Sequence, residues 1–293
     1  MTEVQSNQGV GRPLPVPTPE ELPPLIARSP LAVIDEALTF LRLNPALFFG
    51  LSAVVVIPLQ LIILILPGSS LRGNRPDRTV DILIGSLDQP SAVLNGVGVL
   101  VFESLALFAI ATMYGQVTSA WYSQTSVSPA ELLRAAAKRI PLILGAWTIT
   151  HLIIIAAGLL SFGALGVFLG VLFMLVAPVI GAESLGLGDS LKRSRELTMS
   201  KLGQSLIVFV VVAAAGQVMD ASIRFAPTFI LQLVDVPPWI TGGVFDVVAS
   251  VLVVSFTAAT SVVLYLDLRV RREGIDLYMA IGKSFTASGS RGR

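Results

Sequence analysis

Six long apolar stretches constrain the fold of this chain more than any other feature of its sequence. A transmembrane helix needs about 20 mainly apolar residues, and six stretches meet or nearly meet this length: residues 46–66, 93–121, 141–160, 163–181, 202–219 and 243–266. Only 13% of the residues are charged, against about 25% in a typical soluble domain, so polar side chains could not cover its surface in water. The sequence therefore predicts an all-α integral membrane protein with six transmembrane helices.

The Lys and Arg residues are distributed unevenly between the two sides that these spans define. Sixteen of the 20 lie in the terminal segments and the even-numbered loops, whereas the odd-numbered loops hold only Arg72, Arg75, Arg78 and Arg224. Loops rich in Lys and Arg remain in the cytoplasm. We therefore expect a multi-pass protein of the plasma membrane with both termini in the cytoplasm.

A short amphipathic segment precedes each pair of predicted spans on the cytoplasmic side. These segments are SPLAVIDEALTFLRLNP, SPAELLRAAAKRIP and GDSLKRSRELTMSKL. In the first of them Leu31, Ile34 and Leu38 recur at the spacing that is typical of a helix with one apolar face. The chain is therefore predicted to contain three pseudo-repeated hairpins, each preceded by a cytoplasmic interfacial amphipathic helix.

Proline and polar residues dominate the segment before the first of these helices. Residues 1–28 include GRPLPVPTPEELPP, which cannot propagate a helix and has little to bury. We expect a disordered, proline-rich cytoplasmic tail over residues 1–28, a six-helix transmembrane domain over residues 29–285, and a second disordered tail over residues 286–293.

The sequence offers few of the residues from which catalytic and metal sites are built. It has no cysteine and a single histidine, His151, so a thiolate metal site and a cysteine nucleophile are excluded. It contains no G-x-S-x-G, H-E-x-x-H, Walker or G-x-G-x-x-G motif, and its net charge of +1 gives no reason to expect nucleic acid as a partner. We therefore expect no catalytic residue, metal or cofactor, and an enzyme acting on lipid head groups is the least favoured class.

Two ionisable residues lie inside predicted spans, where a charge is costly and therefore points to function. Glu103 lies well inside the second span, and His151 lies mid-way along the third. If the two side chains face one another, they could form a proton-sensitive pair. The alternative is a neutral Glu103 hydrogen-bonded to a serine or a backbone carbonyl in a purely structural role, and the sequence leaves both interpretations open.

Other polar or special residues in the spans are expected to have structural roles. We expect interhelical hydrogen bonds from three glutamines, Gln60, Gln116 and Gln217. Pro178 is predicted to kink the fourth span. Asp220 and Arg224 are four residues apart, a spacing at which they could pair along one helix face.

Residues 264–277, LYLDLRVRREGIDL, bring an abrupt cluster of charge after a long uncharged stretch. We expect Arg269, Arg271 and Arg272 to hold this end of the sixth span in the cytoplasm, near anionic lipid head groups. Gly274 is expected to end the helix. Anchoring of this kind explains the arginines but not the order of Asp, Leu, Glu and Gly between them.

The chain resembles a group of actinobacterial multi-pass proteins labelled as similar to the membrane domain of glycerophosphodiester phosphodiesterases. The resemblance is carried by SPLAVIDEALTFLRLNPALFFG, LVAPVIGAESLGLGDSLKRSREL and YLDLRVRREGIDL. The residues that match its central and terminal patterns are Pro178, Glu183, Arg193, Ser194, Asp267, Arg269, Arg271, Glu273, Gly274 and Asp276. We call these ten the motif residues.

The resemblance implies a membrane topology without an established activity. The label comes from a domain normally fused to a phosphodiesterase barrel that uses paired histidines, carboxylates and a divalent metal, and this chain has no such barrel and no second histidine. We therefore expect a non-enzymatic scaffold or accessory component of an envelope or lipid-related process, in contact with anionic lipid head groups and with a membrane-protein partner. The alternative is a transporter of a small or lipid-like substrate, with proton coupling through Glu103 and His151.

Overall fold

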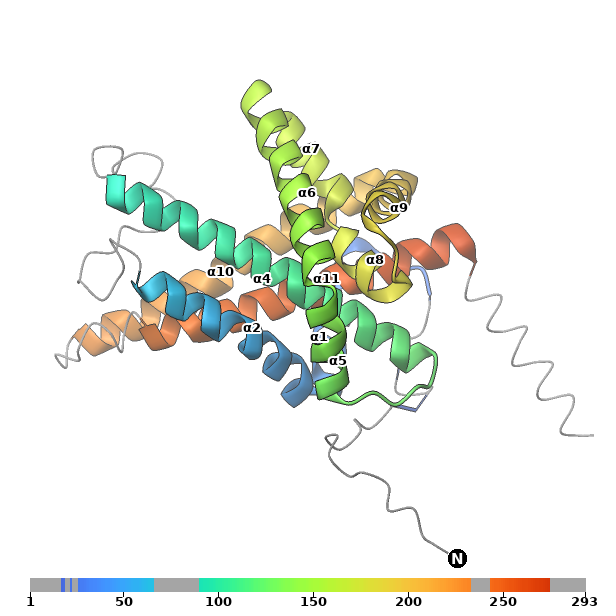
Figure 1. Ribbon diagram of the computed structural model, residues 1–293, viewed down its shortest axis with the longest axis horizontal. Coiled ribbons are helices and arrows are strands. Elements are labelled where there is room, and N and C mark those ends of the chain that lie inside the picture. The colour runs from blue at the N-terminus through green and yellow to red at the C-terminus, as the bar shows by residue number, and fades with distance from the viewer. Residues whose placement is uncertain (1–16, 19–21, 23–25, 66–89, 233–242, 275–293) are drawn as a thin grey trace, which may run out of the picture. The chain divides into compact units, whose positions relative to one another are not determined.

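The residues that the structure describes fold into α-helices joined by short connections (Figure 1). This computed structural model describes residues 17–18, 22, 26–65, 90–232 and 243–274. Within these ranges the helices are α1 (Pro30–Leu43), α2 (Pro45–Ile65), α4 (Pro90–Tyr122), α5 (Pro129–Lys138), α6 (Ile140–Leu160), α7 (Ala164–Phe173), α8 (Val176–Glu183), α9 (Leu187–Ser200), α10 (Leu202–Gln232) and α11 (Phe245–Glu273). Most of the predicted tail over residues 1–28, the predicted tail over residues 286–293, and Asp276 lie outside the described residues.

Six of the described helical segments are long and apolar enough to cross a membrane. They are Pro45–Ile63, Val97–Tyr122, Ile140–Leu160, Ala164–Glu183, Leu202–Arg224 and Phe245–Glu273. The predicted number of spans is therefore confirmed, and the described chain has the makeup of a multi-pass membrane protein. The helix of the fifth span, α10, extends further than the sequence predicts. It continues past Asp220 to Gln232, because Asp220 pairs with Arg224 one turn later.

A short helix precedes each pair of candidate spans along the chain: α1, α5 and α9. The start of α5 shows how the sequence sets such a helix. The Ser128 side chain accepts a hydrogen bond from the Glu131 amide at 3.2 Å, and the Glu131 carboxylate accepts one from the Ser128 amide at 2.7 Å. These reciprocal bonds satisfy two amides that the first helical turn leaves without a partner, and Pro129 suits the position that follows.

A break at Met174 and Leu175 divides the fourth candidate span into α7 and α8. The break lies one turn before Pro178, which has no amide hydrogen and whose ring collides with the carbonyl four residues earlier in a regular helix. The sequence predicts a kink at Pro178, and the structure shows a break in the span one turn before it. It leaves the carbonyl groups of the last turn of α7 available to partners outside that helix.

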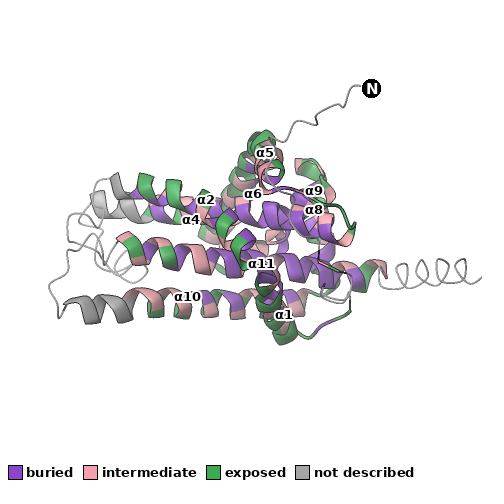
Figure 2. Cartoon of the chain, turned by 90° about the horizontal axis from the view of Figure 1, so that it is seen from below, coloured by how far each residue is buried: buried purple, intermediate pink, exposed green. Residues whose placement is uncertain are grey.

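The described helices pack in two compact units. Unit 1 holds the described residues up to Leu43, residues 111–210 and those from Ala259 onward, and unit 2 holds residues 44–110 and 211–258. Within unit 1, α8 is the most enclosed helix, since six of its eight residues are buried, and Figure 2 colours its ribbon accordingly. A Cβ atom added at Gly181 of α8 would lie 2.0 Å from the carbonyl oxygen of Thr112 in α4. Only glycine therefore permits this contact between the two backbones.

Unit 2 contains α2, the first part of α4, the later part of α10 and the first part of α11. Two hydrogen bonds between polar side chains connect α2 with α11. Gln60 donates from Nε2 to the Ser250 hydroxyl at 2.8 Å, and the Ser255 hydroxyl donates to that of Ser52, also at 2.8 Å. The predicted interhelical hydrogen bond of Gln60 is therefore confirmed.

Candidate functional site

Tyr265 and the motif residues of α11 lie on two different faces of the last part of that helix. Tyr265, Arg269 and Glu273 are spaced by four residues and therefore share one face, while Asp267 and Arg271 share another. Leu266, Leu268 and Val270, which lie between them, are buried apolar side chains. The charged end of α11 therefore offers two polar faces to its surroundings within unit 1.

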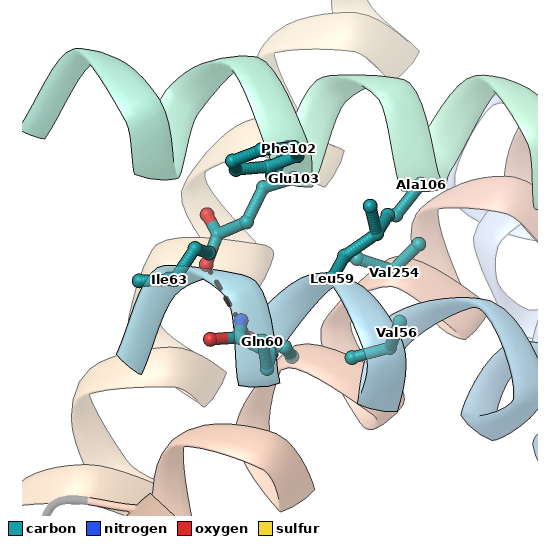
Figure 3. Close-up of a pocket in the computed structure, with 9 residues that line it drawn as sticks. Val56, Leu59, Gln60, Ile63, Phe102, Glu103, Ala106 and Val254 are labelled. Carbon is teal, nitrogen blue, oxygen red and sulfur yellow. Dashed lines mark hydrogen bonds between the residues drawn. The ribbon is translucent and has the colours of Figure 1, made fainter. Parts of the chain in front are cut away.

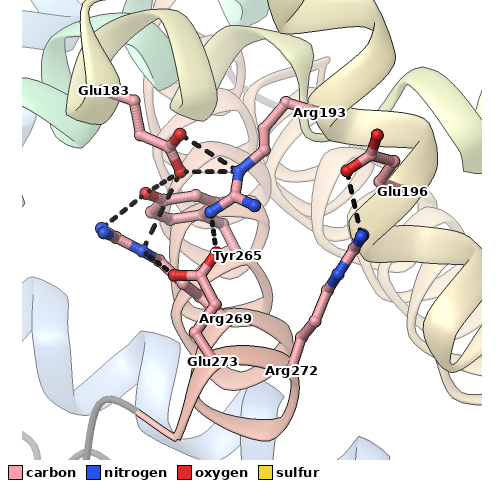
Figure 4. A network of polar contacts seen from close by, with 7 residues as sticks. All are labelled: Glu183, Arg193, Glu196, Tyr265, Arg269, Arg272 and Glu273. Carbon is pink, nitrogen blue, oxygen red and sulfur yellow. Dashed lines mark hydrogen bonds and ion pairs between the residues drawn. The ribbon is translucent and has the colours of Figure 1, made fainter. Parts of the chain in front are cut away.

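The first face joins α11 to α8 and α9 through an ionic cluster (Figure 4). Arg193 of α9 donates from Nε to both carboxylate oxygens of Glu183 in α8 at 3.1 Å, and its Nη2 bonds the carboxylate of Glu273. Tyr265 donates its hydroxyl to Glu183 at 2.9 Å, and Arg269 donates to the Tyr265 oxygen at 3.0 Å and to Glu273 at 2.9 Å. We call these five residues the α8–α9–α11 cluster.

Charge is balanced within this cluster, since two arginines face two glutamates. Burial lowers the pKa of the Arg193 guanidinium, but its hydrogen bonds to Glu273 and Glu183 and their negative charges raise that pKa further, so the net direction is upward. A second α9–α11 ion pair, Arg272 with Glu196 at 3.0 Å, is also neutral overall. The arrangement therefore supplies strong internal bonds and no surplus charge with which to attract an ionic ligand.

The second face of α11 holds the backbone of Arg28. The Asp267 carboxylate accepts hydrogen bonds from the Arg28 amide at 2.5 Å, from Gln204 Nε2 at 2.8 Å and from Arg271 Nε at 2.9 Å. The Arg28 carbonyl accepts from Gln204 at 3.1 Å and from Arg271, and its guanidinium pairs with Glu36 of α1 at 3.3 Å. We call this group the Arg28 clamp.

Arg28 and Asp267 are both buried, with exposed fractions of 6% and 0%. The folded part of the chain therefore begins at or before Arg28, which the sequence analysis places at the end of the proline-rich tail. The backbone bonds to Asp267 and Gln204 hold this segment whatever its side chain, and the Glu36 pair adds a contact that is specific to the arginine.

The remaining motif residues of the described chain stabilise helix ends. Ser194 of α9 donates its hydroxyl to the carbonyl of Leu172 at 2.7 Å, in the last turn of α7 that precedes the Pro178 break. Gly274 has a φ of 60°, and its amide bonds the Val270 carbonyl at 2.9 Å. A residue with this φ at the end of a helix is most often glycine, so the predicted role of Gly274 as the end of the helix is confirmed.

Glu103 borders a small recess inside unit 2 (Figure 3). Figure 3 shows Glu103 of α4 and Gln60 of α2 on facing helices at the edge of this recess, which has room for about one water molecule. The Ser250 hydroxyl donates to Glu103 at 3.3 Å, and Arg224 of α10 lies 3.8 Å from the same carboxylate. Glu103 is therefore hydrogen-bonded to a serine, as the structural interpretation expects, with an arginine beside it.

Arg224 connects these helices further. It bonds Asp220 of its own helix at 2.6 Å, as predicted from their spacing, and the carboxylate of Asp246 in α11. Arg224 thus links carboxylates from α4, α10 and α11 within unit 2. The pair with Asp220 could be predicted from the spacing of the two residues, but the bonds to the other two helices could not.

His151 belongs to unit 1 and its described contacts are local. Its Nδ1 lies 2.8 Å from the carbonyl oxygen of Trp147, one turn earlier in α6, and its ring lies 4.7 Å from the Trp147 ring. Glu103 belongs to unit 2. The structure therefore places the two candidate coupling residues in different units, and their pairing stays a prediction.

Most residues of the α8–α9–α11 cluster, and Asp267 and Arg271 of the Arg28 clamp, could be identified from the sequence, but the other residues of the clamp could not. Arg28, Glu36 and Gln204 were not singled out, because their bonds to Asp267 and to one another depend on contacts between distant parts of the chain. Tyr265 is different, since its spacing of four residues from Arg269 was visible in the sequence and signals a shared helix face.

The described residues contain no group of three or more His, Cys, Asp and Glu side chains placed to hold a metal ion. Comparison of the chain with protein-family models, with curated proteins and with solved structures finds no match.

Proposed function

We propose that this protein is a non-enzymatic scaffold of the plasma membrane that contacts anionic lipid head groups on its cytoplasmic side. In this proposal both termini are cytoplasmic, and three hairpins, each preceded by an interfacial helix, repeat along the chain. The resemblance to the actinobacterial membrane-domain group supports the topology. The protein would serve as an accessory component of an envelope or lipid-related process.

The division of the described basic residues of unit 1 into two sets carries the proposal. One set is bonded within the chain: Arg28, Arg139, Arg193, Arg269, Arg271 and Arg272. The other set is exposed and makes no ion pair with a described residue: Arg42, Arg134, Lys138, Lys192, Arg195 and Lys201. The second set, which we call the exposed cations, is available to anionic head groups.

The positions of the exposed cations fit a membrane surface. All six lie on the short helices α1, α5 and α9 or at the residue after α9. On α5 Arg134 and Lys138 are exposed one turn apart, whereas Leu132 is buried. A cationic side chain near an anionic leaflet contributes about 1 kcal/mol to binding, so the six together would select anionic lipids over zwitterionic ones.

Identification of the lipids and proteins that co-purify with the full chain in mild detergent tests this proposal. We expect anionic lipids to be retained by the native protein and largely lost when the six exposed cations are replaced by Gln. The matched control exchanges Lys for Arg, and Arg for Lys, at the same six positions, which keeps the charge and should keep the lipids. Equal retention by the Gln variant and the control would refute head-group binding, and a pull-down without any specific protein would refute the scaffold.

The recess at Glu103 supports a second candidate function, transport of a small or lipid-like substrate with proton coupling. Its polar lining by Glu103, Gln60 and Ser250 at membrane depth favours this role, while room for about one water molecule limits what could pass without opening. Replacement of Glu103 by Gln should then abolish pH-dependent uptake by vesicles, and replacement of His151 by Gln tests the second coupling residue. Unchanged uptake in the Glu103 variant would exclude its coupling role.

A further inference from the structure

The turn that joins α6 to α7 is apolar, although it connects two candidate spans (Figure 1). Phe162, at its apex, is fully exposed, and Leu159 and Leu160 at the end of α6 are 79% and 85% exposed. No Asp, Glu, Lys or Arg occurs over residues 140–182, whereas the first odd-numbered loop, residues 67–92, holds three arginines and three aspartates. An exposed patch of apolar side chains marks a surface that contacts a membrane or a protein.

The length of this hairpin matches the acyl layer of a membrane and falls short of the full membrane thickness. At the base of the hairpin the Arg139 guanidinium donates to the Ile180 carbonyl at 2.9 Å and to the Ser184 hydroxyl at 2.8 Å, so both legs begin at one level. From that base α6 extends over 21 residues, which is about 31 Å. The hydrocarbon core is about 30 Å thick and the membrane with its head groups about 40–45 Å, a thickness that α4, α10 and α11 can cross with 33, 31 and 29 residues. With Arg139 in one head-group layer, the turn therefore lies about 5–10 Å short of the water on the far side.

Several polar groups at the turn are bonded within the chain. The Ser161 hydroxyl donates to the Ala157 carbonyl at 2.7 Å and accepts from the Leu165 amide at 2.8 Å. The Gly158 carbonyl accepts from the amides of Ser161 at 3.2 Å and Gly163 at 2.7 Å. The turn therefore satisfies its polar side chain internally, and these bonds reduce the cost of leaving water.

Phe162 combines a strained backbone with an uncovered ring. Its φ of 52° lies in the left-handed region, where a bulky side chain is uncommon, and no residue that the structure describes covers the ring. Water around the ring adds the cost of hydrating a large apolar surface, whereas acyl chains remove that cost. Two glycines keep the tip narrow, since a Cβ atom at Gly166 of α7 would lie 3.0 Å from the Cα atom of Gly158 in α6. The hairpin therefore ends in a thin apolar tip that lipid chains can surround.

We propose that the α6–α7 turn is seated in the outer leaflet, among the acyl chains just below the head groups, and is not a loop in the water outside. Every residue from Leu159 to Leu165 is exposed except Ser161, so the tip is apolar on all sides. A protein partner covers one face of a hairpin, whereas acyl chains surround it. Both helices then return to the cytoplasmic side, which leaves the proposed topology of the termini unchanged. The choice of leaflet rests on the proposed function, but the depth of the turn does not.

Spin labels on single cysteines measure this depth, because the chain contains no cysteine of its own. In lipid bilayers, a nitroxide on Phe162→Cys of the full chain should collide more often with oxygen, which concentrates in hydrocarbon, than with a water-soluble nickel chelate. Ile155→Cys lies about 10 Å deeper along α6 and should shift this ratio further toward oxygen, whereas Ser126→Cys, in the exposed connection between α4 and α5, should reverse it. Equal chelate collisions at positions 162 and 126 would place the turn in water and overturn the proposal. Collisions with neither reagent at position 162 would overturn lipid as the occupant.

Thiol labelling in intact cells separates this inference from the proposed function. A membrane-impermeant maleimide should label Ser70→Cys, in the predicted outer loop, and should leave Phe162→Cys and Ser126→Cys unlabelled. Inside-out vesicles should label Ser126→Cys and still leave Phe162→Cys unlabelled. Labelling of Phe162→Cys in intact cells at the rate of Ser70→Cys would overturn the inference. Labelling of Ser126→Cys in intact cells would refute the cytoplasmic side assigned in the proposed function and leave the depth of the turn intact.

Discussion

Replacement of Arg193 by Met should loosen the attachment of α11 to α8 and α9. Met has a length similar to that of the arginine stem and can fill the space of its apolar part. The change therefore removes mainly the charge and the hydrogen-bond donors of the guanidinium. Arg193 bonds Glu183 through Nε and Glu273 through Nη2. Its loss leaves both carboxylates partly enclosed, with Arg269 as the cation that remains between them.

The magnitude follows from the burial of the three side chains. Exposed fractions are 19% for Arg193, 16% for Glu183 and 28% for Glu273, so the cluster lies between a buried pair and a surface pair. Breaking a buried pair costs about 3–5 kcal/mol, and a surface pair contributes about 0–1 kcal/mol. We therefore expect Arg193→Met to lower the free energy of unfolding by about 2 kcal/mol, which is roughly a 30-fold change in the equilibrium constant.

Equilibrium unfolding of the purified chain in mixed detergent micelles measures this effect. Arg195→Met, on the same helix but exposed and outside any described ion pair, is the matched control and should change stability by less than about 0.5 kcal/mol. The double variant with Glu273→Gln should cost less than the two single changes added together, by about 1 kcal/mol, because both remove one interaction. Equal effects of Arg193→Met and Arg195→Met would refute the reasoning.

Three further predictions concern packing, the clamp and pH. Gly181→Ala should destabilise the protein by about 1–3 kcal/mol, because its Cβ would collide with backbone, while Gly188→Ala, a helical position with open space, should be neutral or stabilising; thermal unfolding in detergent separates them. Asp267→Asn should cost about 3 kcal/mol or more, since it removes a charge that is 0% exposed in its ion pair, and it should speed proteolysis before α1. Hydrogen bonds from the backbone and then the side chain of Ser128 lower the pKa of Glu131 below its ordinary value. The stabilisation by Glu131 is therefore present at neutral pH and lost as the pH falls through the lowered pKa, so Ser128→Ala should flatten the acid dependence of helix content in circular dichroism.

The number of spans could be predicted from the sequence because the signal is local. Each span is a continuous apolar run of about 20 residues, and no knowledge of its neighbours is needed to recognise it. The end of α10, which forms the fifth span, could not be predicted in the same way. Asp220 resembles a boundary when it is considered alone, but the helix passes through it because Arg224 neutralises it one turn later and also bonds Asp246 of α11.

The candidate site likewise contains bonds that the local sequence predicts and bonds between distant parts of the chain that it does not. Asp267 and Arg271 are four residues apart, as are Arg269 and Glu273. This spacing alone predicts the two ion pairs within α11. The bonds of Arg193 to Glu273 and of Asp267 to the Arg28 amide join residues 80 and 239 positions apart. Hydropathy and helical periodicity describe one segment at a time, so they cannot supply bonds of that kind.

The three arginines near the end of α11 can serve two successive purposes on the proposed topology. During insertion, acidic residues contribute little to orientation, so Arg269, Arg271 and Arg272 count fully toward retention in the cytoplasm even though Asp267 and Glu273 lie among them. After folding, the same three arginines are bonded to Glu273, Asp267 and Glu196. The acidic residues that interrupt the basic tract therefore need not weaken the orientation signal, and they supply the bonds that fix the end of α11. This accounts for the order of charges in DLRVRRE, which orientation alone leaves unexplained.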